Sequence, residues 1–256
     1  VFAAPLFLSN ILQAVYNIVD MIVVGQVIGG TGMSAVAIGG NVLSILNFIV
    51  MGFASAGQVI IAKAVGRKDP EEVKNTIVTM FTVLLTAAIV MSVVCFFLRD
   101  WILKLVNTPP EAYAYTMDYT LVCLVGLVFI YGYNIVSAIM RGMGDSKRPF
   151  MFVAIASVVN IILDILFVGV FGMEVKGAAL ATVIGQGVSF IYAMLYFYRH
   201  KVEFGFDFKL KSFIPKKETA KALCALGIPM AIQSAAITIS MTFVTAWTNS
   251  FGVVYS

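Results

Sequence analysis

Long apolar runs recur along the whole sequence and constrain its fold more than any other feature. A helix of about 20 apolar residues crosses the hydrocarbon core of a bilayer, which is about 30 Å thick. Inside a bilayer the backbone polar groups must bond within the segment, so we expect a helix for every run. The sequence therefore predicts an all-α polytopic transmembrane bundle. Its seven predicted spans are 2–27, 34–62, 75–98, 114–140, 149–172, 177–199 and 220–250.

Composition supports a membrane setting and excludes several other classes. Apolar residues make up 61% of the chain and charged residues 12%, against about 45–50% and about 25% in soluble domains. The net charge of +4 does not indicate nucleic-acid binding, because the basic residues form short clusters between apolar runs. Cys95, Cys123 and Cys224 lie inside apolar runs without metal-ligand spacing, so we expect neither a disulfide nor a metal cluster.

The basic residues also predict the orientation of the helices. Fourteen of the 17 Lys and Arg residues lie in three alternate segments, 63–74, 141–148 and 199–221. Since such segments remain in the cytoplasm, we expect a multi-pass protein of the cell membrane with a cytoplasmic N-terminus. The basic residues beside the helix ends are interpreted as topological anchors and not as binding residues. These anchors are Arg67, Lys68, Arg141 and Arg148.

A lysine-rich polar segment divides the chain. Pro5 and Pro229 each lead into a helix with early glutamine or serine side chains, and six predicted helices separate the two starts. Parallel repeats in transporters have this arrangement. We therefore expect a six-helix lobe over 1–199, a cytoplasmic linker over 200–218, and the first helix of a second lobe over 219–256. On this interpretation the chain lacks its true N-terminus and stops inside the second repeat of about twelve helices.

Two aspartates inside predicted spans are the strongest candidates for chemistry. A carboxylate in the membrane interior costs about 2.5–3.5 kcal/mol on insertion scales and by default marks an ion pathway or proton relay. Asp20 follows Tyr16, and Asp164 follows Asn160, at a spacing that places each pair on one helix face. Both aspartates and Thr182 fall about 9–14 Å from the outer ends of their helices. We therefore predict a cation site at Asp20, Asn160, Asp164 and Thr182.

The coupling ion stays open at this stage. Two close carboxylates in a low-dielectric cavity cannot easily both remain ionised, so the pair can bind a proton. With Asn160, Thr182 and backbone carbonyls as further oxygen ligands, the same site can instead hold Na⁺. The alternative for Asp20 and Asp164 is simple interhelical hydrogen bonding. No other cofactor is expected.

Four more polar residues within the spans are candidates for lining a substrate cavity, with ordinary interhelical hydrogen bonding as the alternative. They are Gln13, Tyr16, Asn134 and Gln186. Met and Phe side chains suit a wall that repacks around varied apolar ligands, although lipid-facing side chains look the same. Asp118 is interpreted as an interfacial acid, and His200 is given no role.

Together these residues resemble the multidrug and toxic compound extrusion (MATE) family, in the branch that includes DinF-like proteins. The resemblance implies two six-helix lobes, drug efflux driven by H⁺ or Na⁺ entry, and a coupling site in the first lobe at the four residues predicted above. Residues 233–240 contain no carboxylate, unlike a MATE branch that uses an acid in helix seven. The resemblance is carried by Pro5, the Tyr16–Asp20 pair, Gly66-Arg-Lys68, Arg141-Gly-Met-Gly-Asp145 with Pro149, the Asn160–Asp164 pair and Gly177-Ala-Ala-Leu-Ala-Thr182.

These patterns predict a monomeric secondary active exporter of cationic or amphipathic small molecules. A lipid-linked oligosaccharide or lipid flippase is the first alternative, but it needs a cationic cavity for pyrophosphate, and no Arg or Lys lies within the predicted helices of the first lobe. An intramembrane aspartyl protease is a distant alternative, because Gly142-Met-Gly-Asp145 matches the GxGD pattern. Flanking Arg141, Lys147 and Arg148 place Asp145 in water at the cytoplasmic surface, so we expect no enzyme.

Overall fold

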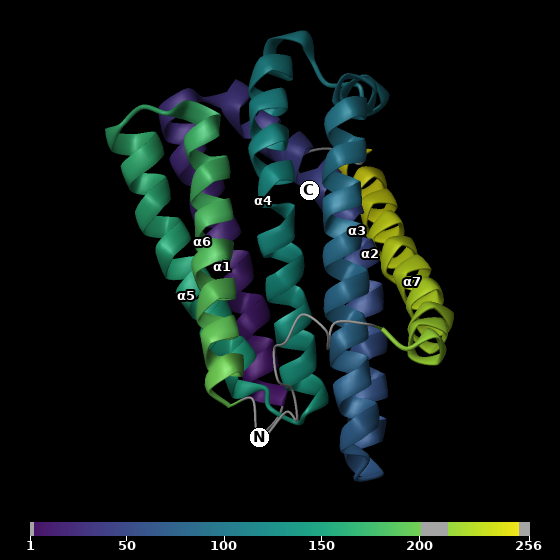
Figure 1. Cartoon of the computed structure of the whole chain (residues 1–256). Helices are drawn as coiled ribbons and strands as arrows, with labels where there is room; N and C mark the ends of the chain where they lie inside the picture. The colour runs from purple at the N-terminus through teal and green to yellow at the C-terminus, as the bar shows by residue number, and fades with distance from the viewer. Residues whose placement is uncertain (1–2, 201–214, 251–256) are drawn as a thin grey trace.

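The computed structural model describes residues 3–200 and 215–250, and over these residues the chain is a bundle of long helices without strands (Figure 1). Seven of the helices are long and apolar enough to cross a membrane. This confirms the predicted all-α polytopic architecture. The helices are α1 (Ala3–Ile28), α2 (Gly30–Gly66), α3 (Pro70–Leu105), α4 (Pro110–Gly142), α5 (Lys147–Asp164), a π-helix η1 (Ile165–Val170), α6 (Glu174–Arg199) and α7 (Lys217–Ser250).

Successive helices run in opposite directions, so the connections alternate between two ends of the bundle (Figure 1). The α2–α3 and α4–α5 connections lie at the end where α1 and α7 begin (Figure 1). Arg67 and Lys68 lie in the first of these connections, and Arg141, Lys147 and Arg148 flank the second. The links from α1 to α2, from α3 to α4 and from η1 to α6 lie at the other end. The segment predicted as a linker, 200–218, falls mostly on 201–214, which lie outside the described residues, as do 251–256.

Helices α2, α3, α4, α6 and α7 are longer than the spans predicted from hydropathy, and the junctions between the helices are shorter than the predicted loops. Only Gly29 separates α1 from α2, where the apolar pattern predicts a loop of several residues. Gly29 has φ of +80°, a left-handed conformation that glycine adopts without steric cost. With 37 residues, α2 is about 55 Å long at 1.5 Å per residue, so it extends beyond a hydrocarbon core of about 30 Å.

The predicted span 149–172 is not one regular helix. The α-helical part ends at Asp164, and Ile165–Val170 continue as a π-helix. Gly172, with φ of +63°, then reverses the chain before α6. π-Helical turns are rare and occur frequently at functional sites, so the position of this turn directly after a buried aspartate draws attention to that residue.

Helix α4 lies at the centre of the bundle and packs against α2, α3 and α6. Its Tyr131 is fully buried and donates a hydrogen bond from its hydroxyl to the backbone oxygen of Leu46 on α2, at 2.7 Å. Ser92 on α3 donates to the backbone oxygen of Leu124 on α4. Because lipid does not drive helices together as water does, such bonds and close packing stabilise the arrangement.

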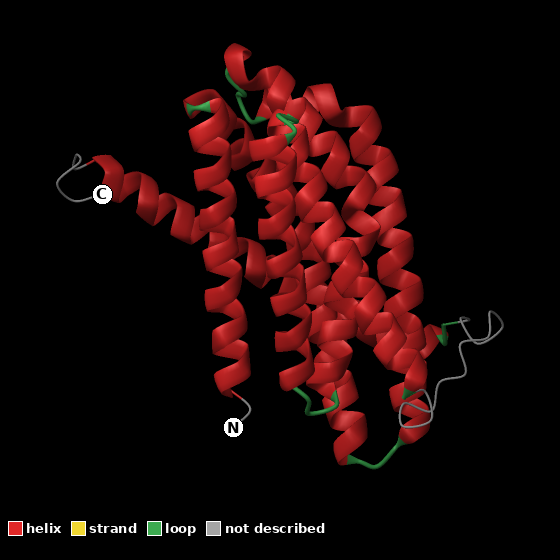
Figure 2. Ribbon diagram, turned by 90° about the vertical axis from the view of Figure 1, so that its left-hand side faces the viewer, coloured by secondary structure: helices red, strands yellow, loops and turns green. Residues whose placement is uncertain are grey.

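Helix α7 packs against α2 and α3. The closest approach is at Gly52, where an added Cβ would lie 2.3 Å from the backbone nitrogen of Ala231. Lys216, just before α7, forms an ion pair with Glu71 at 2.7 Å. In Figure 2 the C-terminal part of α7 runs away from the other helices. The described part of α7 is therefore attached to the bundle mainly through its first half.

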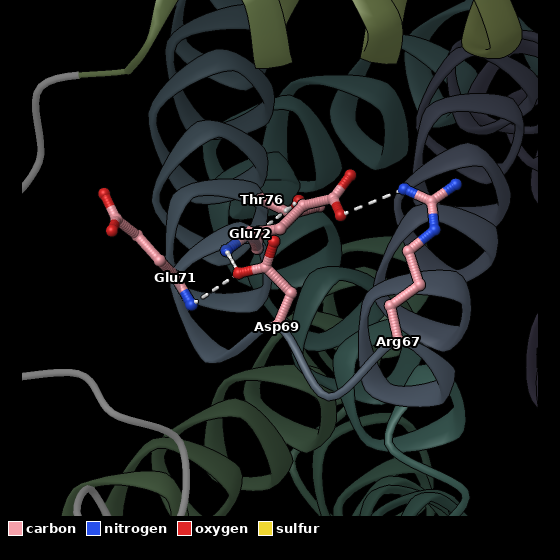
Figure 3. A network of polar contacts seen from close by, with 5 residues as sticks. All are labelled: Arg67, Asp69, Glu71, Glu72 and Thr76. Atoms are coloured by element: carbon pink, nitrogen blue, oxygen red, sulfur yellow. Dashed lines mark hydrogen bonds and ion pairs between the residues drawn. The ribbon is translucent and has the colours of Figure 1, made fainter.

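The start of α3 is fixed by a local polar network at the basic end of the bundle (Figure 3). Asp69 Oδ1 accepts hydrogen bonds from the backbone N–H groups of Glu71 and Glu72, at 3.1 and 2.9 Å. These donors would otherwise be unsatisfied in the first helical turn. Arg67 pairs with Glu72 at 3.5 Å across the turn. The network sets where α2 ends and α3 begins.

Candidate functional site

The two predicted aspartates are buried on neighbouring helices. Asp164, the last residue of α5, is 0% exposed, and Asp20 on α1 is 7% exposed. Helix α1 packs against α5, and Asp164 lies within electrostatic range of Asp20. Both carboxylate oxygens of Asp164 lack a hydrogen-bond partner among the described residues, and so does Oδ1 of Asp20. Unpartnered buried carboxylates are costly unless a proton or cation neutralises them.

The other two residues of the predicted cation site are joined directly. Asn160 Nδ2 donates a hydrogen bond to Thr182 Oγ1 at 3.3 Å, which ties α5 to α6 one turn before Asp164. The Oδ1 atom of Asn160 has no partner in the described part of the chain. The structure therefore gathers several unsatisfied oxygen atoms on α1 and α5. Oxygen atoms are the ligands of hard cations, and a carboxylate pair also binds protons.

Tyr16 connects this cluster to the polar residues of α1 and α6. Its side chain lies beside Gln13 and Gln186 and within electrostatic range of both Asp20 and Asp164. Tyr16 and Asp20 lie one turn apart on α1, as the sequence spacing predicts. The phenol thus lies near both the carboxylates and the carboxamides of Gln13 and Gln186.

A cavity of about 880 Å³ lies between α1, α2, α4 and α6, with the start of α5 at its wall. All four residues predicted for a substrate cavity, Gln13, Tyr16, Asn134 and Gln186, line it. Of the predicted cation site, Asp20 and Thr182 line the cavity, whereas Asn160 and Asp164 do not. Asp20 is therefore the carboxylate in contact with the cavity, and Asp164 lies behind it.

Helix α2 supplies cavity residues that the sequence analysis missed. Asn41, Ser44 and Asn47 are three residues apart, and this spacing places them on adjoining positions of one helix face. The spacing was visible in the sequence but lies within a long run of apolar and glycine residues. With them, the cavity is lined by eight carboxamide side chains, namely Asn10, Gln13, Asn17, Asn41, Asn47, Gln58, Asn134 and Gln186.

Arg141, which the sequence analysis interprets as a topological anchor and not as a binding residue, lies at the wall of the cavity. Arg141 belongs to the last turn of α4, is half-buried, and lines the cavity. Its Nε donates a hydrogen bond to Gln58 Oε1 on α2 at 3.0 Å. The apolar run ends at residue 140, whereas α4 continues to Gly142 and so includes Arg141. The expectation that no Arg or Lys lies within the helices of the first lobe is therefore wrong for α4, which contains Arg141.

Comparison with known proteins identifies the family. The protein-family model MatE matches residues 5–166, which is more than half of the chain. The chain belongs to the MATE family. Because this is a family of transporters, membership confirms the expectation that the chain is not an enzyme. Seven apolar helices and transporter relatives together make it a multi-pass membrane protein.

Several curated relatives align with almost the whole MATE chain. It is 34% identical over 253 residues to the probable multidrug resistance protein YpnP of Bacillus subtilis (strain 168), covering 98% of this chain and 56% of YpnP. It is 30% identical to the probable multidrug resistance protein YoeA of the same organism, covering 98% of this chain and 55% of YoeA. The MATE chain therefore spans about half the length of the curated relatives it matches.

Solved structures give the same picture. A crystal structure of a MATE protein in complex with MaL6 superposes with a TM-score of 0.89 at 25% identity, over 98% of this chain and 55% of that one. A MOP superfamily transporter from Pyrococcus furiosus, described as having a binding pocket of reverse polarity, superposes with a TM-score of 0.88 at 25% identity, over 97% and 54%. The MATE fold of this half is thereby confirmed.

Two acidic residues outside the cavity of the MATE chain have structural partners. Asp145 Oδ1 accepts hydrogen bonds from the backbone N–H groups of Lys147 and Arg148, and its other oxygen pairs with the Arg148 side chain. Asp145 therefore caps the start of α5, which accounts for the GxGD pattern. Asp118 pairs with Lys176 at 3.2 Å and is partly exposed, in agreement with an interfacial position.

Proposed function

We propose that this MATE chain forms the first lobe of a secondary transporter that exports cationic or amphipathic small molecules in exchange for H⁺ or Na⁺. The observation that carries the proposal is the buried pair of Asp20 and Asp164, whose oxygens are incompletely hydrogen-bonded while Asp20 contacts the cavity. Relatives of this chain are described as multidrug resistance and multidrug export proteins. This proposal extends that description to the present chain.

The proposed cycle uses the order in which the residues are reached from the cavity. A proton or Na⁺ enters through the cavity, meets Asp20 first, and is then shared with Asp164, with Asn160 and Thr182 as neighbouring oxygen-bearing side chains. Neutralising the pair removes the repulsion between two buried carboxylates and allows α1 to repack against α5. Transport is coupled if cation and substrate prefer different conformations of this region.

The remaining parts of the proposal concern the complete transporter. We place the coupling site in the first lobe, as in the DinF-like branch, and a second lobe beginning with α7. The basic end of the bundle lies in the cytoplasm, so the N-terminus is cytoplasmic, and the transporter works as a monomer in the cell membrane. The basic residues in and beside the connections at this end support the orientation.

Efflux of a fluorescent cationic dye from vesicles tests the proposal, with the protein reconstituted at its full length and proton or sodium gradients imposed separately. We expect gradient-driven efflux in the wild type and a loss of at least about tenfold in Asp20→Asn and in Asp164→Asn, because each removes one charge from the pair. Asp118→Asn is the matched control, since Asp118 is ion-paired and does not line the cavity. Unchanged efflux in both variants would reduce the aspartates to interhelical hydrogen bonding.

The flippase alternative is favoured by one observation, the presence of Arg141 in the cavity. A pyrophosphate carries more than one negative charge, however, and Arg141 is the only basic residue among the described residues that line the cavity. The exchange of a cation for an organic substrate remains the better supported function. Gradient-independent movement of a fluorescent lipid in the same vesicles would favour the flippase instead.

A further inference from the structure

Arg141 is a half-buried cation that has no counter-ion in the part of the chain that the structure describes. Within the described residues no carboxylate forms an ion pair with it, and its bond to Gln58 Oε1 engages only Nε of the guanidinium. The phenol of Tyr133, on the same helix, lies within electrostatic range of the guanidinium. A half-buried guanidinium at the wall of a cavity, with no carboxylate paired to it among the described residues, is suited to bind an anionic group of a ligand.

The close approach of α2 and α4 holds the guanidinium in place. An added Cβ at Gly142 would lie 2.9 Å from the backbone oxygen of Gln58 and 3.0 Å from side-chain atoms of Ile61. The two helices therefore meet directly at the residue after Arg141, where the Gln58 side chain accepts the bond from Nε. With Nε engaged by the protein, the two terminal nitrogens remain as donors in a fixed fork.

We propose that Arg141 binds a substrate carboxylate, so that the compounds carried by this protein include amphipathic molecules with an acidic group. The inference rests on the proposed transport function and adds a substrate class to it. A planar fork matches the two oxygens of one carboxylate. A phosphate monoester or pyrophosphate would leave negative charge unpaired, because no second basic residue lines the described cavity.

The cavity extends from this subsite towards the carboxylate pair. Tyr119 lies within electrostatic range of both Asp20 and Asp164. It precedes Arg141 by 22 residues on α4, which is about 33 Å along the helix. Tyr133 lies between the two regions, because it is within electrostatic range of both Arg141 and Tyr16. The body of a molecule held at Arg141 would lie against cavity residues such as Tyr133 and Asn134. The carboxylate subsite is thus separate from the cation site.

Equilibrium binding of two rhodamine dyes to the purified full-length protein tests this inference without any gradient. One dye has a free carboxylate, and the other is the ester of the same dye. We expect Arg141→Gln to lose affinity for the free carboxylate by at least about tenfold while its affinity for the ester changes less than about twofold. Arg141→Lys keeps the charge without the fork and should fall between. Arg67→Gln is the control, because Arg67 lies at the same end of the bundle and does not line the cavity.

The outcomes separate the subsite from the transport function. Equal loss of both dyes in Arg141→Gln, or no loss of either, overturns the carboxylate subsite even if the ester is exported under a gradient. Selective loss of the carboxylate dye supports the subsite even if no gradient drives efflux. Displacement of the carboxylate dye by a short-chain phosphatidic acid, but not by a soluble aryl carboxylate, would also overturn it, because the anion recognised would then be a lipid phosphate.

Discussion

Asn160 on α5 donates a hydrogen bond from its Nδ2 to the hydroxyl oxygen of Thr182 on α6, over 3.3 Å. Thr182 lines the cavity, whereas Asn160 is buried behind it. The bond therefore links the cavity wall to the helix that ends at Asp164. In the proposed transporter this bond is a direct polar connection between a cavity-lining residue of α6 and α5.

Thr182→Val should weaken coupling through loss of this bond. A hydrogen bond between membrane helices averages about 0.6 kcal/mol, so we expect gradient-driven dye efflux to fall roughly threefold. Thr120→Val is the control, because the Thr120 hydroxyl is buried without a partner among the described residues. If both variants lose the same activity, the hydroxyl of Thr182 has no special part in coupling. The measurement is the initial efflux rate in reconstituted vesicles.

Asp164→Asn should make the protein more stable while it abolishes coupling. The wild-type carboxylate is fully buried without a hydrogen-bond partner among the described residues, so removing its charge should raise the free energy of unfolding by about 1–3 kcal/mol at a pH high enough to ionise it and without Na⁺. The gain should shrink as the pH falls, because protonation then neutralises the wild-type aspartate as well. Thermal unfolding in detergent followed by tryptophan fluorescence measures the effect.

Asp118→Asn serves as the comparison for this stability measurement. It removes the charge of a partly exposed aspartate that is paired with Lys176, and exposed pairs contribute about 0–1 kcal/mol. We therefore expect little change or a small loss of stability. A gain equal to that of Asp164→Asn would show that the effect comes from net charge rather than from burial.

Gly52→Ala should weaken the attachment of α7. The added methyl group would meet the backbone of Ala231, and overpacking of this kind costs about 1–3 kcal/mol. Gly40→Ala, in the same helix, adds a methyl into open space and should be neutral or stabilise the helix by up to about 1 kcal/mol. Protease sensitivity between α6 and α7 and the midpoint of thermal unfolding report the difference. Equal behaviour of the two variants would contradict a close contact at Gly52.

Asp145→Ala should destabilise the protein without removing any peptidase activity. The Asp145 side chain accepts bonds from the N–H groups of Lys147 and Arg148, and loss of a helix cap costs about 1 kcal/mol. Asp145→Asn keeps an acceptor oxygen and should retain most of the stability. A peptide-cleavage activity in the wild type that disappears in both variants would instead restore the intramembrane protease hypothesis.

The sequence predicts the helices of the bundle well because a bilayer requires each spanning segment to be apolar, helical and about 20 residues long. It also identifies the buried aspartates, since a carboxylate within an apolar run stands out whatever the tertiary structure. Asn160 and Tyr16 follow from their spacing of one turn from Asp164 and Asp20. These features depend only on local sequence and on the cost of burying charge.

Other features depend on tertiary contacts and were not predictable in this way. The π-helix after Asp164 leaves no mark in an apolar pattern, and neither does the single-residue junction at Gly29. Arg141 was assigned to a loop because a charged residue ends an apolar run, although the helix continues to Gly142. The polar side chains of α2 line a cavity only because α1 and α4 pack around the same space, and this packing cannot be predicted from the sequence of α2 alone.

The missing side chain at Gly52 has a mechanical consequence. The backbones of α2 and α7 touch there with nothing compressible between them, so a sideways displacement of α7 pushes directly on the middle of α2. Asn47 lies little more than one turn before that point on α2 and lines the cavity. The contact at Gly52 thus joins α7 to the part of α2 that borders the cavity.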